Sequence, residues 1–311
     1  MLETSIQLFI NGISLGCAYA LITLGFVLVI NAIGAVNFAQ GDLVMASGFL
    51  TVVLAEFIVT DSASSPKGLG LIILPLVLIS MAGFGILFSI ITYSPLKNRP
   101  PASVFISTIA AGLIIQHSIN AGFGPEPQIG PALISSGVIA IGDLIIPKQQ
   151  IAIIVSASFL ILFVGFLMNK TQLGRRLRAA AQDPEMAESI GINGTHCIAI
   201  TFSIAVALAG AAGLLLSNQF FVTTSDGSLF MLKAYIAVTL GGWGRLDGAV
   251  IAAIAIGLFE VIFATLVSYV LTEALLFVAL LVVLLFRPSG FFAEAIQRRT
   301  RCRCSTKGSL F

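Results

Sequence analysis

Residues 169–196, NKTQLGRRLRAAAQDPEMAESIGINGTH, form the longest charged interval between two hydrophobic blocks of the chain. They hold four basic and three acidic residues, whereas only 10% of the chain is charged. The block ILFVGFLM precedes this interval and CIAITFSIAVALAGAAGLLL follows it. Because charged side chains are costly inside a hydrocarbon layer, the pattern predicts a water-exposed loop between two membrane spans. We interpret this loop as a small docking surface.

The composition of the whole chain supports a membrane protein. Hydrophobic residues make up 58% of it and the mean hydropathy is +1.05, compared with about 45–50% apolar residues in soluble proteins. Blocks such as LIILPLVLI lack the alternation of a strand barrel, and a helix satisfies its own backbone in lipid. We therefore expect an all-α, polytopic integral membrane protein of about eight transmembrane helices. One or two segments should be broken or re-entrant, within a single transmembrane domain of residues 1–311.

The distribution of basic residues predicts the orientation. Thirteen of the 16 Lys and Arg residues fall at 97–99, in the loop 169–196, at Arg245 and in the tail 287–311. By the positive-inside rule these segments are cytoplasmic. A count of eight spans, with an outer N-terminus and a cytoplasmic C-terminus, places every basic-rich loop on one side. Cys302 and Cys304 lie in the basic tail and have no assigned role.

Within the loop, the sequence predicts two short helices. Asp183-Pro184-Glu185 is typical of a helix start, because Asp caps free N–H groups and Pro fits the first turn. Gly191 favours a left-handed stop after Ile190. A second short helix is expected at 174–181, and it carries three arginines.

The helix at 184–190 should carry an apolar stripe of Met186, Ala187 and Ile190. A short amphipathic helix with an Ala-rich face fits a groove on another protein. The alternative is an interfacial helix that rests on anionic lipid headgroups through its arginines. The residue pattern alone favours neither.

Polar residues also interrupt the hydrophobic pattern at 31–48, NAIGAVNFAQGDLVMASG. The pattern indicates a broken helix or re-entrant turn, which is tolerated at membrane depth when it is buried in protein or faces a cavity. The alternative is a short cytoplasmic turn in which Asn37 or Asp42 caps the next span. The glycine-broken segments 34–48 and 241–254 share an Asp near the break, and we interpret them as corresponding parts of two related halves.

These segments resemble one known family. The loop is similar to the cytoplasmic loop of branched-chain amino-acid ABC transporter permeases, the Liv-type H subunit family. The matching positions are Gly174, Arg175, Arg178, Ala179, Ala181, Asp183, Ala187, Gly191 and Ile192. The segments 11–25, 37–45 and 237–253 also resemble that family, so the likeness covers nearly the whole chain. Gln40, Asp42 and Trp243 depart from its usual pattern.

The resemblance implies a permease subunit of an ATP-driven importer in a bacterial inner or plasma membrane. Its expected partners are two ATP-binding cassette ATPases, a second and different permease, a periplasmic or surface solute-binding protein, and the lipid bilayer, without nucleic acid. The cargo would be branched-chain or other neutral amino acids. The chain lacks the phosphate loop G-x-x-x-x-G-K-[ST], so we expect ATP hydrolysis on other subunits. We assign no catalytic residue, cofactor or metal. Candidates to line the pathway are Asn37, Gln40, Asp42, Gly241, Gly242 and Gly244.

Two other functions remain open. A urea, short-chain amide or sugar permease of the same superfamily would have the same general pattern. An ion-coupled carrier or channel without ATPase partners belongs to a different class, and Asp42, Glu56 and Glu260 would be its intramembrane charges.

Overall fold

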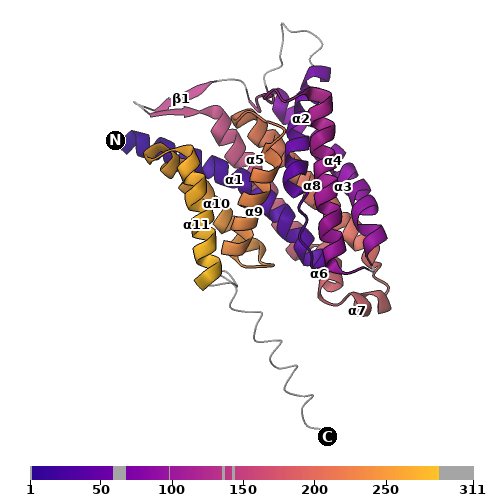
Figure 1. The fold of residues 1–311 in the computed structure, drawn as a ribbon. Helices are drawn as coiled ribbons and strands as arrows, with labels where there is room; N and C mark the ends of the chain where they lie inside the picture. The colour runs from indigo at the N-terminus through magenta and orange to yellow at the C-terminus, as the bar shows by residue number, and fades with distance from the viewer. Residues whose placement is uncertain (1, 59–67, 98, 135–136, 142–143, 287–311) are drawn as a thin grey trace.

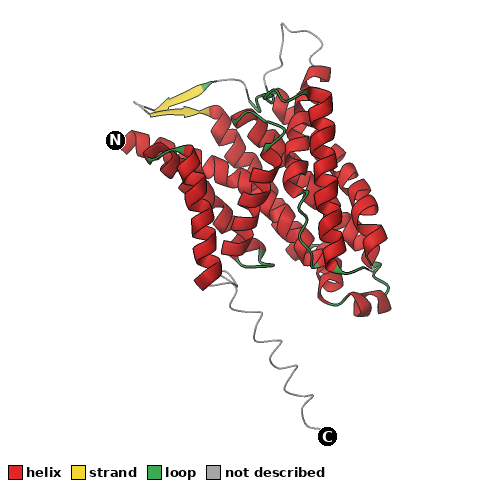
Figure 2. Cartoon of the chain, in the orientation of Figure 1, coloured by secondary structure: helices red, strands yellow, loops and turns green. Residues whose placement is uncertain are grey.

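The computed structural model describes residues 2–58, 68–97, 99–134, 137–141 and 144–286. Helices dominate these residues (Figures 1 and 2), and eight of them are long and apolar enough to cross a membrane, which confirms the predicted all-α fold. The eight are α1 (Leu2–Ile33), α2 (Gln40–Ile58), α3 (Leu69–Phe88), α4 (Pro101–Phe123), α5 (Lys148–Lys170), α8 (Gly194–Gln219), α10 (Leu246–Leu266) and α11 (Tyr269–Phe286). The tail 287–311 lies outside the described residues.

Shorter elements distinguish the two ends of the bundle. At one end lie α6 (Gln172–Gln182) and α7 (Pro184–Ser189), and we call this end the loop side (Figure 1). At the other end β1 (Val138–Ile141) pairs antiparallel with β2 (Leu144–Pro147), and we call it the hairpin side. The remaining elements are α9 (Asp226–Gly241) and two turns that extend α3 on the loop side, the π-helical η1 (Ser89–Tyr93) and the 3-10 helical η2 (Ser94–Leu96).

Helix α9 crosses the bundle together with the segment before it. Its 16 residues extend about 24 Å, which is less than the ~30 Å hydrocarbon core. Helix α8 ends at Gln219 on the hairpin side, and residues 220–225 continue without a helix. Beyond α9, the Gly244 carbonyl accepts a hydrogen bond from Asn31 Nδ2 at the loop-side end of α1, at 3.1 Å. Residues 220–241 therefore form a crossing from one side to the other.

This additional crossing corrects the predicted topology. The expectation of eight long helices is confirmed, but eight crossings would place both chain ends on the same side. With residues 220–241 included, α1 begins on the hairpin side and α11 ends on the loop side (Figure 1). The short helix α9, together with residues 220–225, supplies the additional crossing.

The chain between α1 and α2 enters the bundle without helical structure. Phe38 N donates to Thr108 Oγ1 of α4 at 3.3 Å, and Gln40 Nε2 donates to the Ala205 carbonyl of α8 at 3.2 Å. At 1.5 Å per residue, Thr108 and Ala205 lie about 10 and 16 Å from the loop-side ends of their helices. Helix α2 therefore begins inside the bundle. The structure shows the interrupted segment rather than the short turn at the membrane surface.

A second interrupted segment precedes α9. Val222 forms two backbone hydrogen bonds with Gln128, at 2.8 and 3.0 Å. Further along, Gln116 Nε2 of α4 donates to the Thr224 carbonyl at 3.0 Å. These contacts bind the non-helical backbone to its neighbours, which lipid could not do. Helix α9 then begins at Asp226, inside the bundle.

The first turns of α2 and α9 meet at two glycines. A Cβ atom on Gly41 would overlap the Gly227 carbonyl oxygen, and a Cβ atom on Gly227 would overlap the Asp42 carboxylate. Helix α2 runs towards the hairpin side and α9 towards the loop side, and both begin inside the bundle. We call these two helices half-crossings, and they meet at their N-terminal ends. Only glycine at both positions allows the two backbones to approach this closely.

The order of elements reveals an inverted repeat. The sequence α1, interruption, α2, α3, α4 recurs with opposite direction as α8, interruption, α9, α10, α11. Helix α1 packs along α10, and in the corresponding positions α8 packs along α3. The repeat corrects the predicted correspondence of 34–48 with 241–254. The counterpart of Gly41-Asp42-Leu43-Val44-Met45 is Gly227-Ser228-Leu229-Phe230-Met231, which begins α9 and not α10.

Small residues determine how closely α1 and α10 pack. A Cβ atom on Gly16 would lie 2.7 Å from the Ile254 Cα atom, and one on Gly257 would overlap the Gly16 backbone. By contrast, Gly83 on α3 has nothing within 4 Å of its ideal Cβ position. Close backbone approach through small residues is how helices associate within lipid.

We therefore predict opposite effects for the same substitution at two helical glycines. Gly16→Ala should destabilise the protein by about 1–3 kcal/mol, because the added methyl group overpacks the α1–α10 contact. Gly83→Ala should be neutral or should stabilise the protein by about 0.5–1 kcal/mol, since alanine favours a helix and the site is open. Unfolding midpoints of the purified variants in detergent would test this, and equal shifts would contradict the close contact.

Candidate functional site

The loop 169–196 folds as predicted into two short helices, α6 and α7. Thr171 Oγ1 accepts a hydrogen bond from Gly174 N at 3.2 Å and caps α6. Asp183 Oδ1 accepts from Met186 N at 3.1 Å and caps α7. Gly191 follows with φ of 83°, so the predicted helix start and left-handed stop are both confirmed.

One residue of the predicted apolar stripe is not on the surface. Met186 and Ile190 are 67% and 74% exposed, whereas Ala187 is only 3% exposed and belongs to the main apolar core. Helix α7 turns its small residue inwards because alanine fits closely against the rest of the loop. The exposed apolar surface of α7 therefore consists of Met186 and Ile190.

Both ends of the loop are joined closely to membrane helices. A Cβ atom on Gly174 would overlap the Met168 carbonyl, so glycine allows α6 to fold back against the end of α5. At the other end, Asn193 Oδ1 accepts from His196 N at 3.2 Å and caps α8. The loop therefore continues into α5 and α8 without a long linker.

A cavity of about 220 Å³ lies beneath the loop. Arg178 and Ala181 of α6 line it together with Gly244, from the turn between α9 and α10, and Asp247, from the first turn of α10. Arg178 Nη1 donates to Asn169 Oδ1 at 3.3 Å. The structure thus brings two predicted loop residues and one predicted pathway residue to the same place. Among the other predicted loop residues Arg175 is exposed, whereas Ala179 and Ile192 are partly buried.

The remaining predicted pathway residues lie in two separate regions. Asn37 and Gln40 are fully buried near the start of α2, and Asn37 Oδ1 accepts from Ala39 N at 3.2 Å. Asp42 is partly exposed beside Gly227. Gly241 packs against the backbone of Gly248 at the loop-side end of α9, and Gly242 and Gly244 follow with φ of 90° and 82°.

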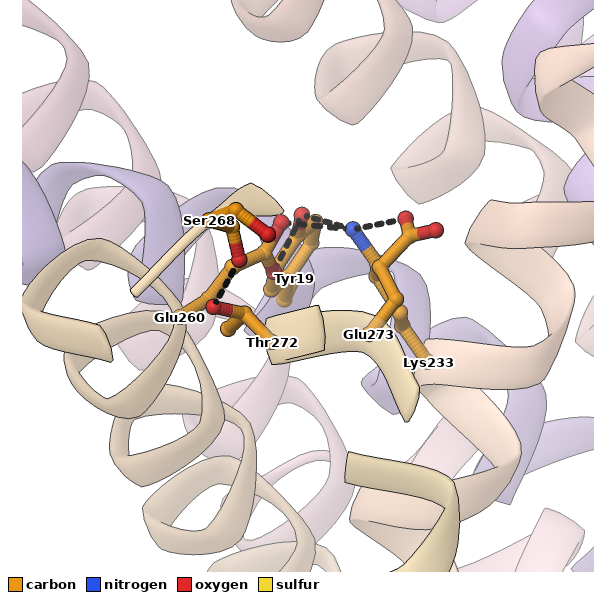
Figure 3. A network of polar contacts seen from close by, with 6 residues as sticks. All are labelled: Tyr19, Lys233, Glu260, Ser268, Thr272 and Glu273. Carbon is orange, nitrogen blue, oxygen red and sulfur yellow. Dashed lines mark hydrogen bonds and ion pairs between the residues drawn. The ribbon is translucent and has the colours of Figure 1, made fainter. Parts of the chain in front are cut away.

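A buried network of charged groups lies on the side of α9 that faces away from its contact with Gly41 (Figure 3). Lys233 Nζ lies 2.7 Å from Glu260 Oε1 and donates to Tyr19 Oη at 3.0 Å. Tyr19 Oη donates to Glu260 Oε2 at 3.0 Å. Glu273 Oε1 lies 3.7 Å from the same ammonium group. The network therefore joins α9 to α1, α10 and α11.

This network differs from what the sequence predicted. The alternative of a carrier makes Glu260 a free intramembrane charge, whereas the structure pairs it with Lys233, and both residues are buried. The lysine within the hydrophobic block 229–241 was an available signal, because charges in a span usually face a partner. Nothing in the local sequence indicates Tyr19, which reaches Glu260 only through the packing of α1 on α10.

A cavity of about 390 Å³ adjoins this network. Asp226 and Tyr269 line it together with Lys233, Glu260 and Tyr19. Lys233 and Tyr19 each donate to one carboxylate oxygen of Glu260, whereas the buried Glu273 Oε1 accepts no hydrogen bond and only faces the Lys233 ammonium group. The arrangement is therefore better suited to joining helices than to chemical reaction.

Comparison with known proteins shows the family. Residues 8–285 match the family model described as branched-chain amino acid transport system / permease component. The high-affinity branched-chain amino acid transport system permease protein BraD of Pseudomonas aeruginosa is 30% identical over 295 residues, which are 93% of this chain and 96% of BraD. LivH of Escherichia coli K12, with the same descriptive name, is 29% identical over 298 residues and the same shares of the two chains.

Other matches are shorter. The fructose import permease protein FrcC of Rhizobium meliloti is 24% identical over 150 residues, 46% of this chain and 37% of FrcC. None of the solved structures matches the chain. Since the family match covers nearly all of the described residues, this chain belongs to the branched-chain amino acid transport system permease family.

Proposed function

We propose that this protein is a membrane-spanning permease subunit of an ATP-driven importer for branched-chain or other neutral amino acids. The observation that supports this most strongly is the likeness to BraD and LivH over 93% of the chain. A sugar permease is less well supported, because the match to FrcC covers only 46% of the chain. The ion-coupled carrier loses Glu260 as a free charge, since Lys233 pairs with it.

The proposed assembly contains two ATPase subunits, a second and different permease, and an external solute-binding protein. The ATPases would hydrolyse ATP, and this chain would be no enzyme. The loop side would be cytoplasmic, because Arg175, Arg176 and Arg178 lie there. The end of α11 would then face the cytoplasm.

The docking surface for an ATPase would be the exposed face of α7. Met186 and Ile190 present apolar surface there, and the arginines of α6 lie nearby. A hydrophobic anchor with a polar rim is the common form of a protein interface. Movement of this surface would be carried into α5 and α8, as alternating access requires.

The proposed pathway passes the meeting point of α2 and α9. Asp42 is partly exposed there, and Ser225 and Ser228 of the facing segment are exposed. Broken helices at mid-membrane depth form the substrate sites of many transporters. The buried Asn37 and Gln40 would hold the interrupted backbone in place. Gly241, Gly242 and Gly244 would form the turn that moves beneath the loop.

The Lys233 network would hold α9 while α2 moves. Its bonds to α1, α10 and α11 lie on the opposite side of α9 from the contact with Gly41. Removing one partner from a buried ion pair leaves an uncompensated charge. The network would therefore fix the position of one half-crossing.

The first test concerns docking. Met186→Glu combined with Ile190→Glu should reduce amino-acid uptake more than about tenfold, because charges placed at the centre of an apolar interface cost several kcal/mol. Uptake by vesicles that contain the full transporter measures this, and immunoblotting checks the amount of protein in the membrane. Thr195→Glu is the control, since it adds one carboxylate to the same loop at a favourable helix N-terminus. Normal uptake by the double variant would exclude the docking role of α7.

The second test concerns the pathway. Asp42→Asn should lower the rate of uptake at least about tenfold, which corresponds to ~1.4 kcal/mol, and ATPase binding should be unchanged. Glu56→Gln is the control, because it removes an acidic charge from an exposed position near the other end of α2. Equal uptake by the two variants would contradict the proposed role of Asp42 in the pathway.

The third test concerns the charged network. Lys233→Met should destabilise the protein by about 3–5 kcal/mol, because Glu260 loses its buried partner. The double change Lys233→Met with Glu260→Gln should recover part of this loss, since it removes the unpaired charge. Unfolding of the purified proteins in detergent measures the stability of each variant. A loss in the double variant equal to the sum of the losses caused by the two single changes would show that the two residues do not interact.

A further inference from the structure

An apolar groove separates α3 from α5 on the hairpin-side half of the bundle. Its volume is about 590 Å³. Leu71, Leu74 and Leu78 of α3 form one wall, and Ala152, Val155 and Phe159 of α5 form the other. The Ser156 hydroxyl also lies there, but it donates to the Ala152 carbonyl at 2.7 Å and so offers no free donor to a ligand.

The groove opens towards the surroundings of the helix bundle. Leu71, Val155 and Phe159 are 58%, 62% and 66% exposed. In a membrane span such exposed apolar side chains face lipid or another helix. A groove of this kind must be filled, because an empty space forfeits dispersion contacts along its whole length.

The length of the groove matches one half of a bilayer. The lining residues of α5 run from Lys148 to Leu160, about 18 Å at 1.5 Å per residue. One leaflet contributes about half of the ~30 Å hydrocarbon core. The groove therefore accommodates one acyl chain that ends near the middle of the membrane.

The hairpin-side end of the groove carries a positive charge. Lys148, the first residue of α5, lines this end. Among the described residues its ammonium group forms no ion pair. Beside it, Gln149 Oε1 accepts from Ile134 N at 3.3 Å, whereas its buried Nε2 donor has no partner. The Lys148 ammonium group at the end of an apolar groove is complementary to a phosphate group.

We propose that this groove binds one anionic phospholipid, with an acyl chain between α3 and α5 and its phosphate at Lys148. The charge at one end and the apolar walls along the rest distinguish a lipid from a transmembrane helix of a partner. Because α5 leads directly into the loop 169–196, which we call the coupling loop, the bound lipid also separates α3 from the helix that carries α6.

The experiment uses the full chain in nanodiscs of phosphatidylethanolamine that contain a trace of phosphatidylglycerol with a photoreactive group in one acyl chain. After irradiation, mass spectrometry of peptides should place the label mainly on residues 71–78 and 151–160. Ala152→Trp should abolish this labelling, because indole fills the groove. Leu162→Trp is the control, since Leu162 is 73% exposed on the same helix but lies outside the groove. Val155→Trp replaces Ala152→Trp if the latter does not fold.

A second measurement tests the headgroup. Lys148→Gln should reduce the preference for labelled phosphatidylglycerol over labelled phosphatidylcholine about fivefold, because one basic side chain near an anionic lipid contributes ~1 kcal/mol. Lys170→Gln, at the other end of α5, should leave the preference unchanged. Equal labelling of the groove and of exposed residues on α11 would overturn the proposal. Loss of groove labelling when the second permease is present would also overturn it, since a protein helix would then occupy the groove.

Discussion

Two non-helical segments inside the bundle determine how the other helices are arranged. Hydrocarbon offers no hydrogen-bond partners, so backbone outside a helix must be satisfied by the protein itself. Helix α4 supplies Thr108 to the first segment and Gln116 to the second, while α8 supplies the Ala205 carbonyl near the first. Helices α4 and α8 are therefore held next to both interruptions. The two segments also explain why α2 and α9 begin within the bundle.

The contact between the two half-crossings depends on opposing requirements. Gly41 and Gly227 allow the backbones to touch, and the positive ends of two helix dipoles then lie close together. Asp42 and Asp226 in the two first turns offset this charge. On the far side of α9, the pair of Lys233 and Glu260 anchors the helix to the rest of the second repeat. Charges and glycines thus lie where the repeat leaves the helices incomplete.

The features that could be predicted from the sequence are those that depend on local signals. Asp183 specifies the start of α7 through its own side chain and Gly191 specifies the stop through its own backbone, so both could be read directly from the sequence. The burial of Ala187 depends on the packing of the loop and could not. The predicted correspondence of 34–48 with 241–254 is wrong, because glycine and Asp also occur at 241–248, where they form the turn after α9 and the start of α10. Tyr19 and Glu260 are 241 residues apart, and only the packing of α1 on α10 unites them.

Helix α8 connects the loop with the interrupted region in the proposed mechanism. It begins at the end of the coupling loop, and it receives hydrogen bonds from Gln40 at Ala205 and from Ser47 at Ala209, at 3.2 and 3.1 Å. Helix α2 is therefore bonded to the helix that a docked ATPase would move. Helix α9 instead touches α2 through glycine contacts and is bonded elsewhere by Lys233. Contacts without hydrogen bonds separate more readily than bonded ones, so displacement of α8 would open the bundle between α2 and α9, where Asp42 lies.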